Sequence, residues 1–209
     1  MSMATGSAKS TFLKGIWSEN PVFVQILGIC STLAVTNSVR NTAVMCAGLV
    51  YATAFSCLTV SLLRRRIPGR IRMMVEVLII AGYVLVVDLA LKAYVPDISR
   101  QLGPYVGLII TNCIVMGRAE AFALNNRPGL SFVDGFASGL GYAYVLLAIS
   151  VLRELLGAGT FWGVPVLWAG WVNWTIMIMA PGAFFVLAVI VWIIRGYVMP
   201  PPKAEGAKS

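Results

Sequence analysis

The stretches PVFVQILGIC (Pro21–Cys30) and PYVGLIITNC (Pro104–Cys113) decide the fold of this chain. Each runs from a proline to a cysteine nine residues later, and neither carries a charge. Proline is well tolerated in the first turn of a helix, so we expect each proline to open one. Nine helical residues rise about 13–14 Å, close to half of the ~30 Å hydrocarbon core of a bilayer. The two cysteines are therefore predicted near the middle of a membrane.

The composition is that of an integral membrane protein. Hydrophobic residues make up 59% of the 209-residue chain and charged residues 11%, whereas soluble domains average about 25% charged. The mean hydropathy is +0.85. A net charge of +8 would suggest nucleic acid in a soluble protein, but here it indicates basic loops at an anionic lipid surface. We expect one domain in a lipid bilayer and no nucleic-acid partner.

Hydropathy divides the chain into six apolar spans. The basic linker that begins at Arg64 follows the second span, and the polar loop NNRPGLSFVDG (Asn125–Gly135) precedes the fifth. A segment with four tryptophans (Gly157–Trp174) suits the membrane interface before the sixth. The predicted spans are residues 21–38, 42–63, 73–94, 104 to about 120, 136–156 and 175–195, in a domain at 21–195 with an arm at 1–20 and a tail at 196–209.

Lysine and arginine are distributed unevenly over the loops. Of the 16, twelve fall on the side of the termini. Because loops rich in lysine and arginine stay in the cytoplasm, both termini are predicted to be cytoplasmic. The twelve are Lys9, Lys14, Arg64, Arg65, Arg66, Arg70, Arg72, Arg118, Arg127, Arg195, Lys203 and Lys208, and the other four are Arg40, Lys92, Arg100 and Arg153.

The number of spans gives the two opening stretches opposite directions. The first span enters the membrane from the cytoplasm, and the fourth, after three crossings, enters from the other side. Their starts lie 83 residues apart. We therefore predict an all-α membrane protein of six transmembrane helices in two inverted three-helix repeats, about 21–94 and 104–195. Functional sites in such folds lie at helix interruptions near the midplane, and Gly28 and Thr111-Asn112 are the predicted interruptions of the first and fourth helices.

The four cysteines fall into two pairs. Cys30 and Cys113 occupy matched depths, whereas Cys46 and Cys57 both lie in the second span and are interpreted as small buried hydrophobes. Two thiolates that approach from opposite sides make half of a four-thiolate site, which holds an iron–sulfur cluster or zinc. Because zinc would have little to stabilise within a membrane, a redox cluster fits better, and no histidine is present as a ligand. The other two ligands would come from another subunit or a symmetric copy.

Two charged pairs have simple structural interpretations. Asp88 and Lys92 stand four residues apart in the third span, the spacing of a helical ion pair. Arg153 and Glu154 lie at the outer end of the fifth span. Both pairs are predicted to neutralise each other at the membrane interface, with the long side chains reaching toward water.

Arg118 and Glu120 follow Cys113 by five and seven residues and approach the cytoplasmic interface. Ionisable residues in spans suggest function, and both a contact with another subunit and a role near a redox site remain open for them. The sequence has no glycine-rich phosphate loop after a strand, and a Ser/His/Asp triad needs histidine. We expect no catalytic residue in this chain and no flavin or NADH bound by the chain itself.

Five long segments carry a resemblance to a known family. They are NPVFVQILGICSTLAVT (Asn20–Thr36), LKAYVPDISRQL (Leu91–Leu102), VGLIITNCIVMGRAEAFA (Val106–Ala123), SFVDGFASGLGY (Ser131–Tyr142) and LRELLGAGTFWG (Leu152–Gly163). These segments resemble the NqrDE/RnfAE family, in particular the D-type membrane subunits of bacterial Na⁺-translocating NADH:quinone oxidoreductase. The likeness covers about residues 17–196.

The resemblance implies more than the spacing does. In this family the paralogous D-type and E-type proteins have six spans each and opposite topology, and each gives two cysteines to a shared iron centre, described as a [2Fe–2S] cluster. Carried over, those ligands are Cys30 and Cys113. The implied protein is an inner-membrane component of a six-subunit translocase, with A-, B-, C-, E- and F-type partners. Electrons from NADH pass through the F-type partner and this cluster toward flavin in the C-type partner, then through the B-type partner to ubiquinone, while Na⁺ is exported.

Three other functions are compatible with the residues. The E-type protein of the Rnf complex has the same core motif but serves electron transport between ferredoxin and NAD. An inverted-repeat solute transporter is a second alternative, although the spans hold few paired polar groups. A purely structural role in a complex is the third, and it would tolerate replacement of both Cys30 and Cys113.

Overall fold

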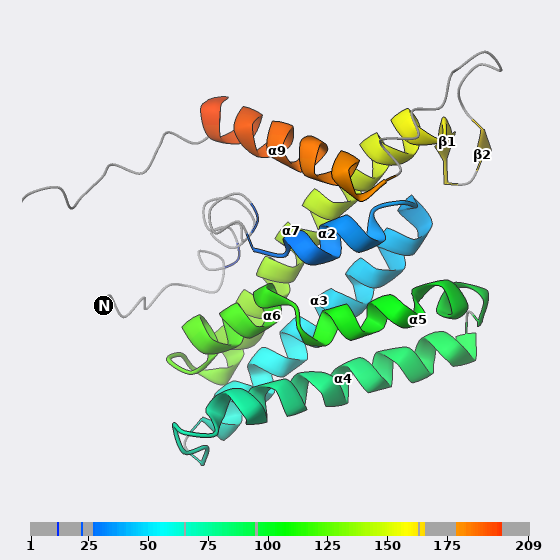
Figure 1. The fold of residues 1–209 in the computed structure, drawn as a ribbon. Coiled ribbons are helices and arrows are strands. Elements are labelled where there is room, and N and C mark those ends of the chain that lie inside the picture. Colours follow the sequence, from blue (N-terminus) through cyan, green and yellow to red (C-terminus); the bar gives the residue numbers. More distant parts are fainter. Residues whose placement is uncertain are drawn as a thin grey trace, which may run out of the picture.

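In the residues that it describes, the computed structural model consists of helices and one short hairpin (Figure 1). It describes residues 27–64, 66–94, 96–162, 164–165 and 179–197, together with residues 12 and 22. The helices are α2 (Ile29–Val35), α3 (Val39–Leu63), α4 (Arg72–Tyr94), α5 (Pro96–Ile110), α6 (Cys113–Arg118), the π-helix η2 (Ala119–Ala123), α7 (Pro128–Gly157) and α9 (Ala180–Tyr197); the hairpin pairs β1 (Thr160–Phe161) with β2 (Val164–Pro165).

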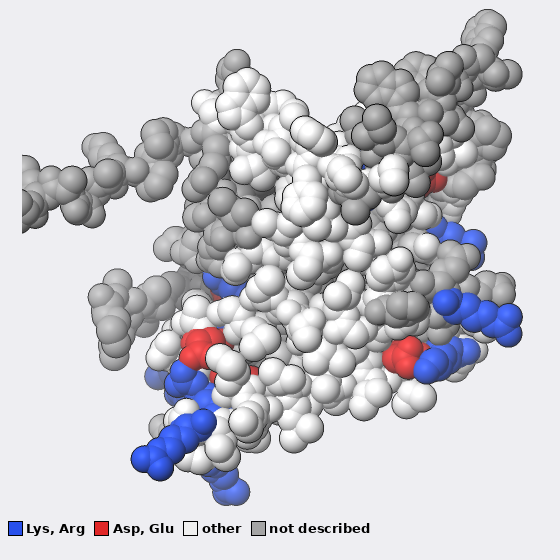
Figure 2. All heavy atoms as spheres, in the orientation of Figure 1, with Lys and Arg blue, Asp and Glu red and all other residues white. Residues whose placement is uncertain are grey.

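Four helical segments in the described residues are long and apolar enough to cross a membrane. They are Val39–Leu63, Arg72–Tyr94, Tyr105–Ala123 and Pro128–Gly157, and α9 adds a shorter apolar helix at Pro181–Ile194. Charged side chains gather at two ends of the face drawn in Figure 2, with a wide uncharged belt between them. The prediction of a multi-pass helical membrane protein is therefore confirmed.

The six-span inverted repeat stays a prediction. Within the first predicted span the structure describes Val22 and Leu27 to Ser38, and the described part of the sixth begins at Met179. Pro21, most of the arm and the tail, and most of the tryptophan segment lie outside the described residues. The second, third and fifth predicted spans correspond to α3, α4 and α7.

Helices α3 and α7 run side by side at the centre of the fold (Figure 1). Two glycines of α7 bring the backbones together. A Cβ atom on Gly135 would lie 2.9 Å from the Thr53 carbonyl oxygen and 3.2 Å from Cys57 Sγ, and one on Gly139 would lie 3.1 Å from Val50 Cα. Close approach at small residues is the usual basis of helix packing in membranes, where lipid offers no hydrophobic drive.

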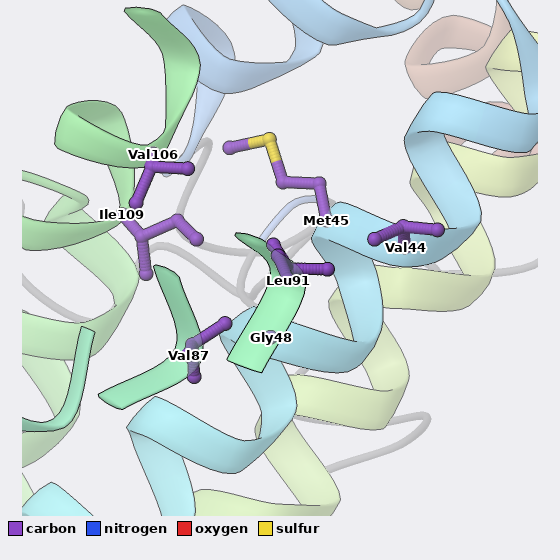
Figure 3. Close-up of a pocket in the computed structure, with 7 residues that line it drawn as sticks. All are labelled: Val44, Met45, Gly48, Val87, Leu91, Val106 and Ile109. Carbon is purple, nitrogen blue, oxygen red and sulfur yellow. The ribbon is translucent and has the colours of Figure 1, made fainter. Parts of the chain in front are cut away.

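Helices α3, α4 and α5 meet around a small apolar cavity (Figure 3). Its lining offers no nitrogen or oxygen to a ligand, so it is a packing gap between helices and not a candidate site. The lining residues are Val44, Met45 and Gly48 of α3, Val87 and Leu91 of α4, and Val106 and Ile109 of α5.

Two expected helix starts are wrong. Helix α5 begins at Pro96, and Pro104 lies inside it; Pro96 supplies an earlier proline for the first turn. Helix α7 begins at Pro128, so most of the predicted polar loop at 125–135 is helical. Its polar residues are accommodated because they are buried against other helices, with Ser131 0% and Asp134 1% exposed.

Replacing Gly135 with alanine is expected to destabilise the protein by about 1–3 kcal/mol. The new Cβ atom would contact the Thr53 carbonyl oxygen and force α3 and α7 apart. The midpoint of thermal unfolding in detergent measures the effect. Gly129→Ala is the matched control, because a Cβ atom there would meet nothing within 4 Å. Equal midpoints for the two variants would contradict the close helix contact.

Candidate functional site

A left-handed turn before α2 and a break between α5 and α6 frame the candidate site. Gly28 has a left-handed backbone (φ 81°, ψ 17°) and immediately precedes α2. Thr111 and Asn112 separate α5 from α6, and Asn112 is extended (φ −68°, ψ 121°). The predicted interruption of the fourth helix is confirmed. For the first, the structure describes the left-handed residue and the helix after it, whereas residues 23–26 lie outside the described part.

Cys30 and Cys113 occupy equivalent places after these breaks. Cys30 is the second residue of α2, and Cys113 is the first residue of α6. Both are exposed at the surface of the chain and both are free thiols. A ligand or a partner can therefore reach either cysteine.

A hydrogen bond joins the two cysteine-bearing turns. Asn112 Nδ2 donates to Ser31 Oγ over 2.8 Å, and both side chains are fully buried. The other side-chain atom of Asn112, Oδ1, accepts from the Ile114 amide at 3.0 Å and so caps α6. Ser31 follows Cys30, and Asn112 precedes Cys113. The Asn112 side chain therefore both caps α6 and holds the two cysteine-bearing turns together.

Gly28 is fixed by its neighbours as well as by its backbone. Its carbonyl oxygen accepts from Tyr142 Oη and from Thr32 Oγ1, each at 3.0 Å. A Cβ atom at this position would lie 2.7 Å from both Ile114 Cδ1 and Tyr142 Cε2. Glycine is therefore required twice, because the left-handed backbone disfavours other residues and because no space remains for a side chain.

The other two cysteines are packing residues, as the sequence indicated. Cys46 is 4% exposed and Cys57 is 1% exposed. Cys46 Sγ lies 3.9 Å from the Ala143 carbonyl oxygen, and Cys57 packs with Val60 and Ala119 in a small apolar cluster. The structure thus separates two accessible thiols at helix breaks from two buried ones within α3.

The donor set fits half of a four-thiolate centre. Among the described residues, no group of three or more Cys, Asp or Glu side chains could hold a metal ion. Cys30 and Cys113 are two accessible sulfur donors of the type that holds iron–sulfur clusters and zinc. A four-ligand centre here would need two ligands from outside the described part of this chain.

Arg118 is buried and pairs with a residue that the sequence interpretation placed in a loop. It donates from Nε to Asp134 Oδ2 at 3.0 Å and from Nη2 to Asp134 Oδ1, and the two residues are 5% and 1% exposed. The pair ties α6 to α7 just beyond the cysteine site. Hydropathy placed Asp134 in a loop because a run of polar residues beside a proline is typical of one. The sequence signal for this pair was that Asp134, at the start of the next helix, carries a charge opposite to that of Arg118.

The predicted mutual neutralisation of Arg153 and Glu154 at the interface is wrong. They are 2% and 5% exposed, and each is bound to other elements. Glu154 Oε2 accepts from the Val39 amide at 2.6 Å, which caps α3, and Arg153 Nη1 donates to Thr36 Oγ1 at 2.5 Å. Adjacent residues of one helix point in different directions, so they serve separate partners.

Two ion pairs lie nearer the surface. Lys92 Nζ lies 2.6 Å from Asp88 Oδ2, as the four-residue spacing predicted. Glu120, in the π-helix η2, pairs with Arg72 at the start of α4. Glu120 therefore has a partner within the chain, and it ties η2 to the end of α4 that follows the basic linker.

Comparison with known proteins identifies relatives along nearly the whole chain. The family model described as "Rnf-Nqr subunit, membrane protein" matches residues 8–191. A protein of Haemophilus ducreyi is 48% identical over 198 residues, which are 92% of this chain and 96% of its own. One of Photobacterium profundum is 46% identical over 206 residues (96% and 97%), and one of Pseudomonas aeruginosa strain LESB58 is 46% identical over 200 (93% and 89%). All three are named as the D subunit of a "Na(+)-translocating NADH-quinone reductase".

Gly28→Ala is expected to cost about 2–4 kcal/mol of stability, from the left-handed backbone and from the steric clash together. Gly117→Ala, close by, is the control, because the nearest atom to its Cβ would be Leu27 Cδ1 at an ordinary 3.6 Å. The thermal unfolding midpoint of each variant measures the difference. A Gly28 variant as stable as the Gly117 variant would show that the turn does not need glycine.

Arg118→Met is expected to destabilise the protein by about 3–5 kcal/mol, because Asp134 stays buried without its guanidinium partner. Adding Asp134→Asn should restore much of that loss, since the remaining amide carries no charge. A double-variant cycle on unfolding in denaturant checks this. Additive losses in the double variant would contradict a direct pairing of the two groups.

Proposed function

Because this chain belongs to the Rnf-Nqr family of membrane subunits, we propose that it is the D-type component of a Na⁺-translocating NADH:quinone reductase. Support comes from the curated relatives above, which carry that name at 46–48% identity and match this chain over most of their length. The Rnf alternative shares the family, but these names favour the reductase. In this proposal the chain is one component of a multisubunit oxidoreductase and does not act alone.

Within that complex, Cys30 and Cys113 supply two of the four ligands of an iron–sulfur centre, a [2Fe–2S] cluster shared with the paralogous E-type partner. The observation that carries this proposal is the bond between Asn112 and Ser31. It holds two accessible thiols on adjacent turns, while Cys46 and Cys57 are buried. This chain offers two accessible sulfur atoms, and no third ligand is grouped with them among its described residues. The other two ligands would therefore come from a partner chain with a similar pair of cysteines.

An iron–sulfur centre supplies one-electron transfer when it is bound. The residues of this chain contribute position and exclusion of water. Asn112 and Gly28 fix the two turns, and Tyr142 closes the back of the site with its ring against Gly28. In the first turn of α6 the Ile114 amide is already bound by Asn112 Oδ1, and hydrogen bonds from other first-turn amides to the sulfur atoms would tune the redox potential of the centre.

The proposed setting is the bacterial inner membrane, with A-, B-, C-, E- and F-type partners and both termini in the cytoplasm. The basic residues at the α3–α4 connection support this orientation, because such loops remain on the cytoplasmic side. Described members of that group include Arg64, Arg66 and Arg70. Electrons derived from NADH would then cross the membrane toward flavin and ubiquinone through a centre at the helix breaks.

The test is to replace each cysteine in the intact complex. Cys30→Ala and Cys113→Ala should each lower the iron and acid-labile sulfide content and abolish the electron paramagnetic resonance signal of the centre. Cys46→Ala and Cys57→Ala are the matched controls and should keep both, since they remove only buried packing atoms. Unchanged iron and sulfide in Cys30→Ala or Cys113→Ala would refute the ligand assignment.

A further inference from the structure

Glu76 is a buried carboxylate that the proposed function does not use. It lies on α4, one turn after Arg72, and is 0% exposed. Neither Oε1 nor Oε2 has a hydrogen-bond partner in the part of the chain that the structure describes. A charged group in that situation loses its hydration without compensation, which costs free energy unless a counter-charge is bound.

Arg72, the cation beside Glu76, forms its closer ion pair with another carboxylate. Arg72 Nε lies 3.9 Å from Glu76 Oε1, too far for a hydrogen bond. Arg72 Nη2 instead pairs with Glu120 of η2. Two carboxylates thus share one guanidinium, which leaves one negative charge, and the residue without hydrogen bonds is the buried Glu76.

Another ionisable group of the described residues, the buried Cys57 thiol of α3, lies within electrostatic range of Glu76. A thiol supplies no positive charge. Arg72 and Glu120 are the partly exposed members of this group, with side chains 39% and 41% exposed. They lie at the basic end of the molecule, beside the α3–α4 connection.

We propose that Glu76 binds one monovalent cation, a proton or a sodium ion, which enters past Arg72 and Glu120. The cation supplies the positive charge that the buried carboxylate lacks. Arg72 has two acceptors within reach, so movement of its guanidinium from Glu120 to Glu76 would displace the bound cation. The site does not depend on the assignment of the cysteine ligands, because Glu76 lies on α4 and the thiols lie on α2 and α6.

The experiment compares the purified complex with its Glu76→Gln variant, in which the amide keeps the shape of the carboxyl group. Two measurements are made at neutral pH. One is infrared absorption in sodium-free buffer, and the other is ²²Na⁺ binding by equilibrium dialysis at constant ionic strength. If a proton is bound, the variant loses a protonated-carboxyl band; if sodium is bound, it binds one ion fewer per complex. Identical spectra together with identical ²²Na⁺ binding would overturn the proposal.

Two further variants sharpen the result. Glu120→Gln should release Arg72 to pair with Glu76 and should therefore weaken the same signal at least severalfold, although Glu76 is intact. A signal at full strength would overturn the role given to Arg72. Thr59→Val is the matched control, since Thr59 Oγ1 bonds Tyr83 Oη across the same α3–α4 interface, and it should leave both measurements unchanged. The iron content, measured in parallel, should stay at the wild-type level in every variant.

Discussion

The hydrogen bond between Asn112 and Ser31 is the contact on which the architecture depends. A helix that breaks inside a membrane exposes backbone groups that lipid cannot satisfy, so broken helices persist there only when protein covers them. Asn112 caps α6 and reaches Ser31 with one side chain. Tyr142 and Thr32 satisfy the carbonyl oxygen of Gly28. Each turn is therefore held by residues of the other turn, of α7 or of its own following helix.

Helix α7 contacts α6, the turn at Gly28 and α3, and it holds them in place. Along its length it carries Asp134, which binds Arg118, then Tyr142 at the breaks, and then Glu154, which caps α3. The glycines between them let α3 lie directly against it. Polar anchors at three heights of one helix fix rotation as well as position, which apolar packing alone does weakly because lipid and protein interiors are equally apolar.

Hydropathy predicted the spans that are long apolar runs, but not the positions of polar residues that are buried against a partner on another helix. The spans of α3 and α4 follow from long apolar runs, and the break at Thr111 and Asn112 follows from two polar residues before Cys113. Pro104 was predicted to begin a helix because proline fits the first turn, but the helix begins at Pro96, an earlier proline. Arg153 was predicted at the membrane interface and Asp134 in a loop, because a linear pattern does not show their partners across the bundle, Thr36 and Arg118.

The exposed thiols of Cys30 and Cys113 are better placed to meet a partner than the buried thiols of Cys46 and Cys57. Within the described residues, the breaks at Gly28 and Asn112 are covered on their inner side by Tyr142 and Ile114, whereas Cys30 and Cys113 remain open to the outside. In lipid, an open polar turn is stabilised by a partner that supplies complementary groups. If that partner brings the remaining thiolates, then binding of the metal and assembly of the complex are one linked equilibrium, in which each stabilises the other. A rigid half-site on each chain then serves assembly as much as chemistry.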